Sequence, residues 1–439
     1  MKVYLDTIGC RLNQAEIERM AREFRAAGHQ LVADPAEADL AVVNTCAVTA
    51  HAVSDSRQRI RRLARAGAKR VVATGCWATL EPAQAAALPA VETVVPNAHK
   101  DTLVAHVLGL PPQTFDLEPI AREPLPGSRA RTRAFIKVQD GCDNRCTFCV
   151  TTLARGPSRS RSEADILADI QAALQGGAQE VVLTGVHLGS WGHDLTPPRH
   201  LRHLVQAVLQ NTAVPRLRLS SLEPWDLDEA FFALWEDPRL ARHLHLPLQS
   251  GSAATLRRMA RKTTPEAFAR LVATARRLIP EVAITTDLIA GFPGETEEEF
   301  AETLAFVKSM EFAGGHVFTY SERPGTAAAR MPHPVPLAVR KARNAMLRQI
   351  LEASAARYRR RFIGRTLTVL WESATPTAEG GFLLRGLSDN YLRVQAHAPE
   401  NWWNRLMDVH ITDEHEATLS GQIVSPERHP PPKVRRRQK

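Results

Sequence analysis

The stretch that decides the fold runs from residue 134 to residue 149 and reads AFIKVQDGCDNRCTFC. Its first six residues predict a buried strand, and a short loop with three cysteines in a C-x3-C-x2-C pattern follows directly. Structural zinc sites and fully ligated iron–sulfur clusters both take four protein ligands. Three thiolates on one loop can each cap one iron of a cubane cluster and leave the fourth iron open for a small molecule. The pattern of Cys142, Cys146 and Cys149 therefore favours a reactive cluster over a zinc site that borrows a distant histidine.

Strand-like and helix-like segments alternate downstream of this loop. Six such units predict an incomplete version of the eight-unit parallel barrel, with a doubly wound sheet as the alternative. In a barrel the cysteine loop lies at the carboxyl end of the first strand, where active sites of barrels form. The strands are predicted at 134–139, 180–185, 216–221, 243–248, 282–290 and 316–320, and the helices include 163–174, 200–209, 265–278 and 297–310.

The amino-terminal stretch also alternates strands with helices and predicts a second parallel sheet. Cys10, Cys46 and Cys76 each follow one of its predicted strands, at 2–6, 39–44 and 70–74. The carboxyl ends of parallel strands share one edge of a sheet, so the three thiols are expected to converge there. The alternative is that each is a small buried hydrophobic residue. The remaining elements predicted here are a strand at 91–96 and helices at 14–27, 53–66 and 102–108.

The fold class expected is thus α/β, and the predicted boundaries divide the chain into six parts. The region after 365 consists of short alternating segments with Gly and Asn turns, which predicts a small all-β barrel. The parts are a cluster domain (1–110), a proline-rich linker (111–133), a partial barrel (134–340), a connecting helix (341–361), the β-barrel (362–424) and a basic, disordered tail (425–439).

Composition and charge restrict the class of protein and its partners. The chain of 439 residues has 44% hydrophobic and 23% charged residues, no run long enough to span a bilayer and no leader-like start, so we expect a cytoplasmic monomer. In that compartment thiols stay reduced and paired cysteines bind metal. The net charge is +9, with basic residues concentrated in 57–70 and 425–439. Such basic clusters favour binding to a polyanionic partner. The alternative is that the first is the solvated face of a helix and the second a disordered tail.

The cysteine pattern resembles the radical S-adenosylmethionine superfamily, and the three upstream cysteines resemble its methylthiotransferases. The resemblance covers nearly the whole chain and includes a C-terminal RNA-binding barrel of the TRAM type. Residues 150–154 depart from the family, which often has a proline and an aromatic residue there. The motifs most similar to the MtaB branch are GCRLNQ (9–14), NTCAVT (44–49), ARG with RSR (154–156, 159–161), LTGVHLG (183–189), GFPGET (291–296) and GLSDNY (386–391).

The resemblance implies an activity and its cofactors. Cys142, Cys146 and Cys149 would hold a 4Fe–4S cluster that binds and cleaves S-adenosylmethionine, and the upstream cysteines would hold a second 4Fe–4S cluster that carries the inserted sulfur. The substrate implied is N6-threonylcarbamoyladenosine at position 37 of tRNA, methylthiolated at C2, with a flavodoxin- or ferredoxin-like reductant. Candidate contacts of S-adenosylmethionine are Gly185, His187, Gln249, Asp287 and Gly291, and candidate contacts of RNA or substrate are Arg155, Arg159 and Arg161.

Two other interpretations remain open from the sequence. The first is a methylthiotransferase that acts on isopentenyladenosine in tRNA or on an aspartate of a ribosomal protein. The second is a non-catalytic iron–sulfur electron carrier or RNA-binding protein. A carrier would normally bind each cluster through four residues, and neither set here has four cysteines.

Overall fold

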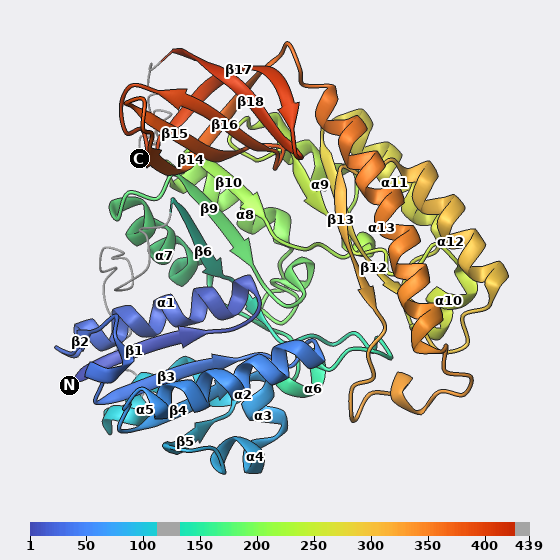
Figure 1. Ribbon diagram of the computed structural model, residues 1–439. Coiled ribbons are helices and arrows are strands. Elements are labelled where there is room, and N and C mark those ends of the chain that lie inside the picture. Colours follow the sequence, from blue (N-terminus) through green and yellow to red (C-terminus); the bar gives the residue numbers. More distant parts are fainter. Residues whose placement is uncertain (112–131, 426–439) are drawn as a thin grey trace.

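The computed structural model describes residues 1–111 and 132–425, so most of the predicted linker and nearly all of the predicted basic tail lie outside the described residues. Figure 1 shows three parts: an amino-terminal α/β layer structure, a central half-barrel and a carboxy-terminal β-barrel. This arrangement confirms the predicted α/β class with a small additional barrel.

The amino-terminal sheet is parallel throughout and has the order β2-β1-β3-β4-β5. Its central strand β3 is buried along its whole length, with Leu40 and Val42 in the core under α1 and Ala41 and Val43 in the core under α2. This two-residue alternation explains why the strand is apolar on both faces at its first four positions. The elements are β1 Lys2–Thr7, α1 Arg11–Ala26, β2 Gln30–Leu31, β3 Leu40–Thr45, α2 Ala50–Arg65, β4 Val71–Gly75, α3 Cys76–Leu80, α4 Pro82–Ala86, β5 Val91–Val95 and α5 Leu103–Leu108.

The central domain is an open barrel of six parallel strands in chain order. Two three-stranded sheets, β10-β9-β6 and β11-β12-β13, are joined by parallel bridges between Leu217 and Leu240 and between Ser221 and His245. The strand order never reverses, which excludes the doubly wound alternative. The strands are β6 Arg133–Lys137, β9 Glu180–Thr184, β10 Arg216–Leu219, β11 His243–His245, β12 Ala283–Ala290 and β13 Gly314–Thr319, and the main helices are α7 Glu163–Gln175, α8 Leu201–Asn211, α11 Pro265–Leu278 and α12 Glu297–Met310.

Short elements surround the cysteine loop of this domain. Strands β7 and β8 form a two-residue hairpin ladder on either side of the loop, and α6 begins two residues after its last cysteine. These elements fix both ends of the loop against the mouth of the half-barrel. They are β7 Gln139–Asp140, α6 Thr151–Arg155, β8 Arg159–Ser160 and α10 Ala253–Arg258. A further short helix, α9 Glu229–Phe232, packs against α11 instead.

The carboxy-terminal part is a long helix, α13 Leu337–Arg360, followed by a closed five-stranded barrel around the fully buried Trp371. The barrel contacts the amino ends of the half-barrel strands, where Arg216 and Arg218 donate to the carbonyls of Leu387 and Ser388 at 3.1 Å. Figure 1 shows it on the opposite side of the half-barrel from the amino-terminal domain. Its strands are β14 Thr366–Pro376, β15 Phe382–Ser388, β16 Arg393–Ala398, β17 Leu406–His415 and β18 Thr418–Ser425.

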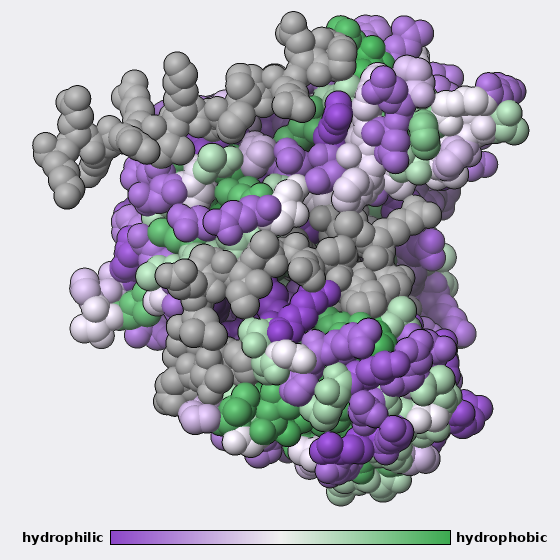
Figure 2. Space-filling model, turned by 90° about the vertical axis from the view of Figure 1, so that its left-hand side faces the viewer, coloured by the Kyte–Doolittle hydropathy of each residue, from purple (hydrophilic) through white to green (hydrophobic). Residues whose placement is uncertain are grey.

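The face of the molecule shown in Figure 2 is mostly hydrophilic, with hydrophobic residues in separate small groups. None of the helices in 1–111 and 132–425 combines the length and the hydrophobicity that crossing a membrane requires.

Candidate functional site

The three amino-terminal cysteines come together because two glycines remove side chains between them. Gly9 has a φ of +104°, and a Cβ there would lie 2.7 Å from the Sγ atom of Cys46. Gly75 has a φ of +97°, and its Cβ would lie 2.2 Å from the carbonyl oxygen of Thr45. Other residues would be strained at both φ values and would push the loops apart. Gly9 and Gly75 thus allow the three strand ends that carry the cysteines to lie close together.

This amino-terminal trio is Cys10, Cys46 and Cys76, and it is open on one side. Cys10 is exposed, whereas Cys46 and Cys76 are buried. Burial, together with the nearby Cys10 and Cys76, raises the pKa of the Cys46 thiol to about 11, against the opposing charge of Arg155. The amide of Asn97 lies 3.7 Å from the Cys76 sulfur. Thiols held in the neutral form in this way lose their protons when they bind a metal.

The cysteine loop of the half-barrel is held in place by backbone hydrogen bonds. Gly141 has a φ of +73°, and a Cβ there would lie 1.9 Å from the carbonyl oxygen of Pro157, so glycine is required. The amide of Cys142 donates to the Gly156 carbonyl at 3.1 Å, and the amide of Thr147 donates to Met259 at 3.1 Å. The loop is therefore fixed both to the chain that follows it and to the segment after α10.

The loop trio, Cys142, Cys146 and Cys149, is partly exposed, and a buried arginine contacts one of its sulfurs. The Nη1 atom of Arg261 lies 3.6 Å from the Cys146 sulfur, and its guanidinium pairs with Glu223 at 2.5 Å. Hydrogen bonds to cluster sulfurs are one means by which proteins tune cluster potential. Arg261 is thus placed to tune a cluster on this loop.

The two trios are connected through α6. Ala154 packs in the same hydrophobic core as Cys46 and Cys76, and its carbonyl accepts a hydrogen bond of 2.8 Å from the Asn97 amide. The same amide group contacts the Cys76 sulfur, so one side chain joins the amino-terminal trio to the helix that follows the loop trio. The relative position of the two thiol sets is therefore fixed by the packing of Ala154 and the hydrogen bonds of Asn97.

Neither trio is arranged as the ligand set of a single ion. Within the described ranges, no three His, Cys, Asp or Glu side chains converge as a metal ion would require. One zinc ion holds every sulfur at about 2.3 Å, whereas in a cubane cluster each thiolate caps a different iron and the sulfurs lie further apart. With three cysteines each and no fourth ligand in the pattern, both trios fit an iron–sulfur cluster with one open iron.

Two predicted cofactor contacts, Gly185 and His187, follow β9 at the mouth. A Cβ at Gly185 would lie 2.9 Å from the Oε1 atom of Gln139, so this glycine allows a close approach. His187 is buried, and its Nε2 atom lies 2.6 Å from Asp226. Although burial disfavours the charged ring, hydrogen bonds to Asp226 and to the Cys142 sulfur raise the pKa of His187 to about 10. His187 thus contacts the loop trio.

The other three predicted contacts lie along β12 and its end. Gln249 is held with a φ of +75° by backbone hydrogen bonds to β12, including one of 2.8 Å to the Asp287 carbonyl. Gly291 packs against Arg340 of α13, where a Cβ would lie 2.4 Å from its Cγ. Buried Oδ1 of Asp287 and Oγ of Ser220 have no hydrogen-bond partner in the described chain. Unsatisfied polar atoms at a barrel mouth fit a ligand rich in ammonium, carboxylate and hydroxyl groups.

The three arginines predicted to contact RNA or substrate have different environments. For Arg155 the structure corrects the expectation of an accessible side chain: it is buried, and Glu16 at 2.9 Å and Asp140 at 2.8 Å already compensate its charge. Arg161 pairs with Asp169 at 2.7 Å. Arg159 is exposed, and as an RNA contact it remains a prediction.

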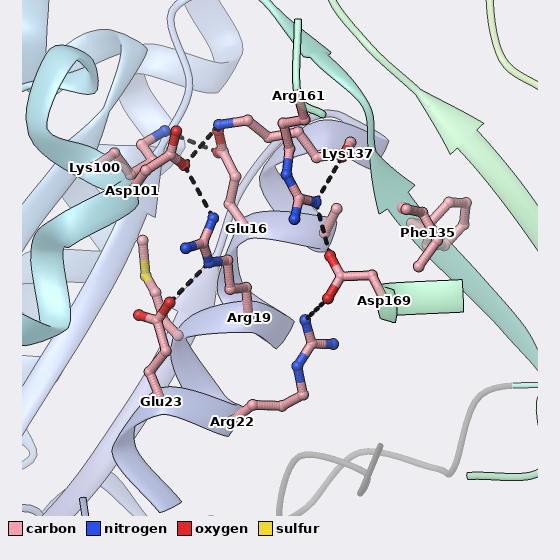
Figure 3. Close-up of a pocket in the computed structure, with 13 residues that line it drawn as sticks. Glu16, Arg19, Arg22, Glu23, Lys100, Asp101, Phe135, Lys137, Arg161 and Asp169 are labelled. Atoms are coloured by element: carbon pink, nitrogen blue, oxygen red, sulfur yellow. Dashed lines mark hydrogen bonds and ion pairs between the residues drawn. The ribbon is translucent and has the colours of Figure 1, made fainter. Parts of the chain in front are cut away.

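A network of ion pairs joins α1 of the amino-terminal domain to the half-barrel. Figure 3 shows the small pocket at this junction, whose charged lining residues pair with one another. Arg22 pairs with Asp169 at 2.9 Å, Lys100 with Glu16 at 2.9 Å, and Lys137 reaches Glu16 at 3.5 Å. The charged side chains here pair with each other, and the pairs that cross the boundary hold the two domains together.

Sequence reasoning missed several residues of the site. Asn97 lies two residues after β5, the last strand of the amino-terminal sheet, so the strand-end rule applied to the cysteines could have identified it. Arg261 and Glu223 meet across 38 positions of the chain, and no local pattern marks them. Arg323, buried after β13, hydrogen-bonds Ser321 and has no acidic partner among the described residues; burial lowers its pKa against the opposing effect of nearby Cys46.

Comparison with protein families and solved structures agrees with this geometry. A model described as the radical SAM superfamily matches residues 136–307, and one described as uncharacterized protein family UPF0004 matches residues 2–96. The radical S-adenosylmethionine methyltransferase TsrM from Kitasatospora setae, solved with cobalamin and a 4Fe–4S cluster, superimposes with a TM-score of 0.58 at 16% identity, covering 75% of this chain and 77% of that one. This likeness shows a shared fold.

Curated relatives match nearly the full length. Threonylcarbamoyladenosine tRNA methylthiotransferase MtaB of Bacillus subtilis is 35% identical, covering 96% of both chains, and that of Thermotoga maritima is 38% identical, covering 84% of this chain and 86% of the relative. The tRNA-2-methylthio-N(6)-dimethylallyladenosine synthase of Caldicellulosiruptor saccharolyticus is 32% identical, covering 96% of this chain and 92% of the relative. The chain therefore belongs to the tRNA methylthiotransferase family of radical S-adenosylmethionine proteins.

Proposed function

We propose that this protein adds a methylthio group to C2 of N6-threonylcarbamoyladenosine at position 37 of tRNA. The observation that carries the proposal is the pair of three-cysteine sets, one at each of two facing strand edges, tied together through Asn97 and α6. Two relatives of this chain bear the name of that activity. We further propose that the reaction takes place in the cytoplasm with a flavodoxin- or ferredoxin-like reductant.

In this proposal each part of the chain has a distinct task. Cys142, Cys146 and Cys149 would hold one 4Fe–4S cluster, and Cys10, Cys46 and Cys76 a second. When bound, the clusters and S-adenosylmethionine supply the radical and the sulfur for the insertion. The described residues hold the two thiol sets at a fixed separation, present unsatisfied polar atoms at the mouth, and bury the surrounding walls.

The carboxy-terminal barrel and the exposed arginines of α2 are proposed to bind the tRNA. Arg61 and Arg62 are exposed, and neither has an acidic partner within the part of the chain that the structure describes. Unpaired surface arginines bind phosphate and position RNA without reading its sequence.

Nucleoside mass spectrometry of total tRNA, from cells with and without the gene, tests the proposal. The expected result is loss of 2-methylthio-N6-threonylcarbamoyladenosine, restored by the wild-type gene and by the exposed control variant Lys308→Ala but not by Cys142→Ala. Loss of the isopentenyladenosine derivative instead would keep the family and overturn the substrate. An unchanged tRNA nucleoside profile would overturn the proposal.

A further inference from the structure

A group of arginines surrounds Tyr391 where the three parts of the chain meet. Tyr391 lies in the turn between β15 and β16, with a φ of +67°. Its hydroxyl accepts a hydrogen bond of 2.7 Å from Arg11, the residue after cluster ligand candidate Cys10. Its ring stacks on His243 with a centroid separation of 4.5 Å, and the Arg218 guanidinium lies 5.0 Å from the ring centroid. One tyrosine thus joins the C-terminal barrel, the half-barrel and the amino-terminal cluster loop.

The basic side chains around this tyrosine outnumber the acidic ones. Arg216 and Arg218 share a single carboxylate, Glu180, at 2.5 Å and 2.8 Å. Arg133 pairs with Glu372 at 2.6 Å. Among the described residues one carboxylate, Glu180, therefore compensates the two guanidinium groups of Arg216 and Arg218.

Arg11 adds a fourth cation without an anion. Among the described residues it has no acidic partner, and its polar contact is the Tyr391 hydroxyl. Burial lowers the pKa of the neighbouring His243 well below its usual value, so that ring adds no charge. The arginine group is defined as Arg11, Arg133, Arg216 and Arg218. For three of its members, Arg11, Arg216 and Arg218, the described residues supply one carboxylate, Glu180.

Part of this group can be reached by a ligand. Arg11 and Tyr391 are half-buried, and the Arg133 side chain is 19% exposed, whereas Arg216 and Arg218 are buried. A guanidinium has five N–H donors, and Arg11 uses one on Tyr391. The remaining donors suit a carboxylate, which a planar guanidinium binds through two parallel hydrogen bonds.

We propose that Arg11, held by Tyr391, binds the carboxylate of the N6 substituent and selects a carboxylate-bearing adenosine over one with a neutral alkyl group. This inference rests on the proposed function, because the threonylcarbamoyl group carries a carboxylate and the isopentenyl group does not. The position of Arg11 beside Cys10 puts this recognition next to the amino-terminal thiol set. A site built to hydrogen-bond a polar group discriminates strongly against a ligand that lacks this group, because the polar groups of the site are then left unpaired. An apolar site discriminates less strongly against a ligand that carries an extra polar group.

Equilibrium binding to the full-length holoenzyme tests the proposal without turnover. Three anticodon stem-loop RNAs are compared, identical except for an N6-threonylcarbamoyl group, its carboxamide analogue or an isopentenyl group. We expect wild-type protein to bind the carboxylate RNA about 10- to 100-fold more tightly than the carboxamide RNA. Arg11→Gln should reduce that ratio to near one and leave carboxamide affinity unchanged. Arg11→Lys should retain part of the ratio, and the exposed control Arg348→Gln should retain all of it.

The outcomes separate this inference from the proposed function. Equal loss of affinity for all three RNAs in Arg11→Gln, with an unchanged circular dichroism spectrum, would overturn the inference and identify Arg11 as a general contact. A wild-type protein that does not discriminate the carboxylate from the carboxamide would also overturn it. Product nucleosides are measured separately by mass spectrometry, so a protein that discriminates in binding but does not methylthiolate the carboxylate RNA contradicts the function alone.

Discussion

Glu16→Gln is expected to destabilise the protein because Glu16 is the common anion of a buried network. Its carboxylate lies 2.9 Å from Arg155, 2.9 Å from Lys100 and 3.5 Å from Lys137, and its side chain is 2% exposed. Removing one partner of a buried ion pair leaves an uncompensated charge and costs about 3–5 kcal/mol. We expect a loss of that size in the free energy of unfolding at pH 7, since buried Lys100 loses its acidic partner within the described residues, whereas Arg155 and Lys137 keep Asp140.

Anaerobic urea denaturation, followed by far-UV circular dichroism, measures this loss against the exposed control Glu302→Gln. A loss below about 1 kcal/mol, the range of a surface pair, would refute the reasoning. The double variant with Arg155→Gln adds a second test. Both single variants remove the same contact between Arg155 and Glu16, so the two losses should sum to more than the loss of the double variant.

The same network predicts a pH dependence with a definite sign. Burial raises the pKa of Glu16, but Arg155, Lys100 and Lys137 outweigh burial and hold the pKa well below its ordinary value. A carboxyl whose folded pKa is depressed stabilises the fold above its unfolded pKa of about 4.3 and loses that contribution as the pH falls through the folded pKa. The difference in stability between wild type and Glu16→Gln should stay constant from pH 8 to pH 5 and shrink only in more acidic solution.

Three further predictions follow from the site and the charge pattern. Gly9→Ala would place a Cβ 2.7 Å from the Cys46 sulfur at a φ of +104° and, by disturbing the proposed second cluster, should lose about half of the bound iron. Gly28→Ala, at a φ of +77° with no atom within 4 Å of the added Cβ, should keep the iron, and iron analysis measures both. Deleting 426–439, which lies outside the described residues and has six basic side chains, should weaken tRNA binding and make its log–log salt slope shallower by up to about 4; an unchanged slope would contradict this. Arg261→Lys should weaken the contact with the Cys146 sulfur and make the cluster potential more negative in a redox titration, while an unchanged potential would argue against tuning by Arg261.

The sequence could predict the elements whose signal is local. Strand ends in a parallel sheet share an edge, so the positions of Cys10, Cys46 and Cys76 in the pattern were sufficient to expect them together, and the structure brings them to one edge. The half-barrel was predicted from a different local signal, the alternation of six strand-like segments with helix-like ones. Neither signal predicted β2, because a strand of two residues has no period to detect.

Arg155 shows why the remainder could not be predicted. In sequence it lies in a basic stretch beside the cysteine loop, and such a stretch usually faces solvent. In the structure α6 enters the core of the other domain, and a guanidinium there is tolerable only because Glu16 and Asp140 approach from elements 139 and 15 positions away. Whether Arg155 is a buried ion-pair partner or a surface cation depends on these two carboxylates, which compensate its charge within the protein. Arg11 is the opposite case: its surroundings supply no carboxylate, and the anion it lacks is the reason to expect one from the substrate.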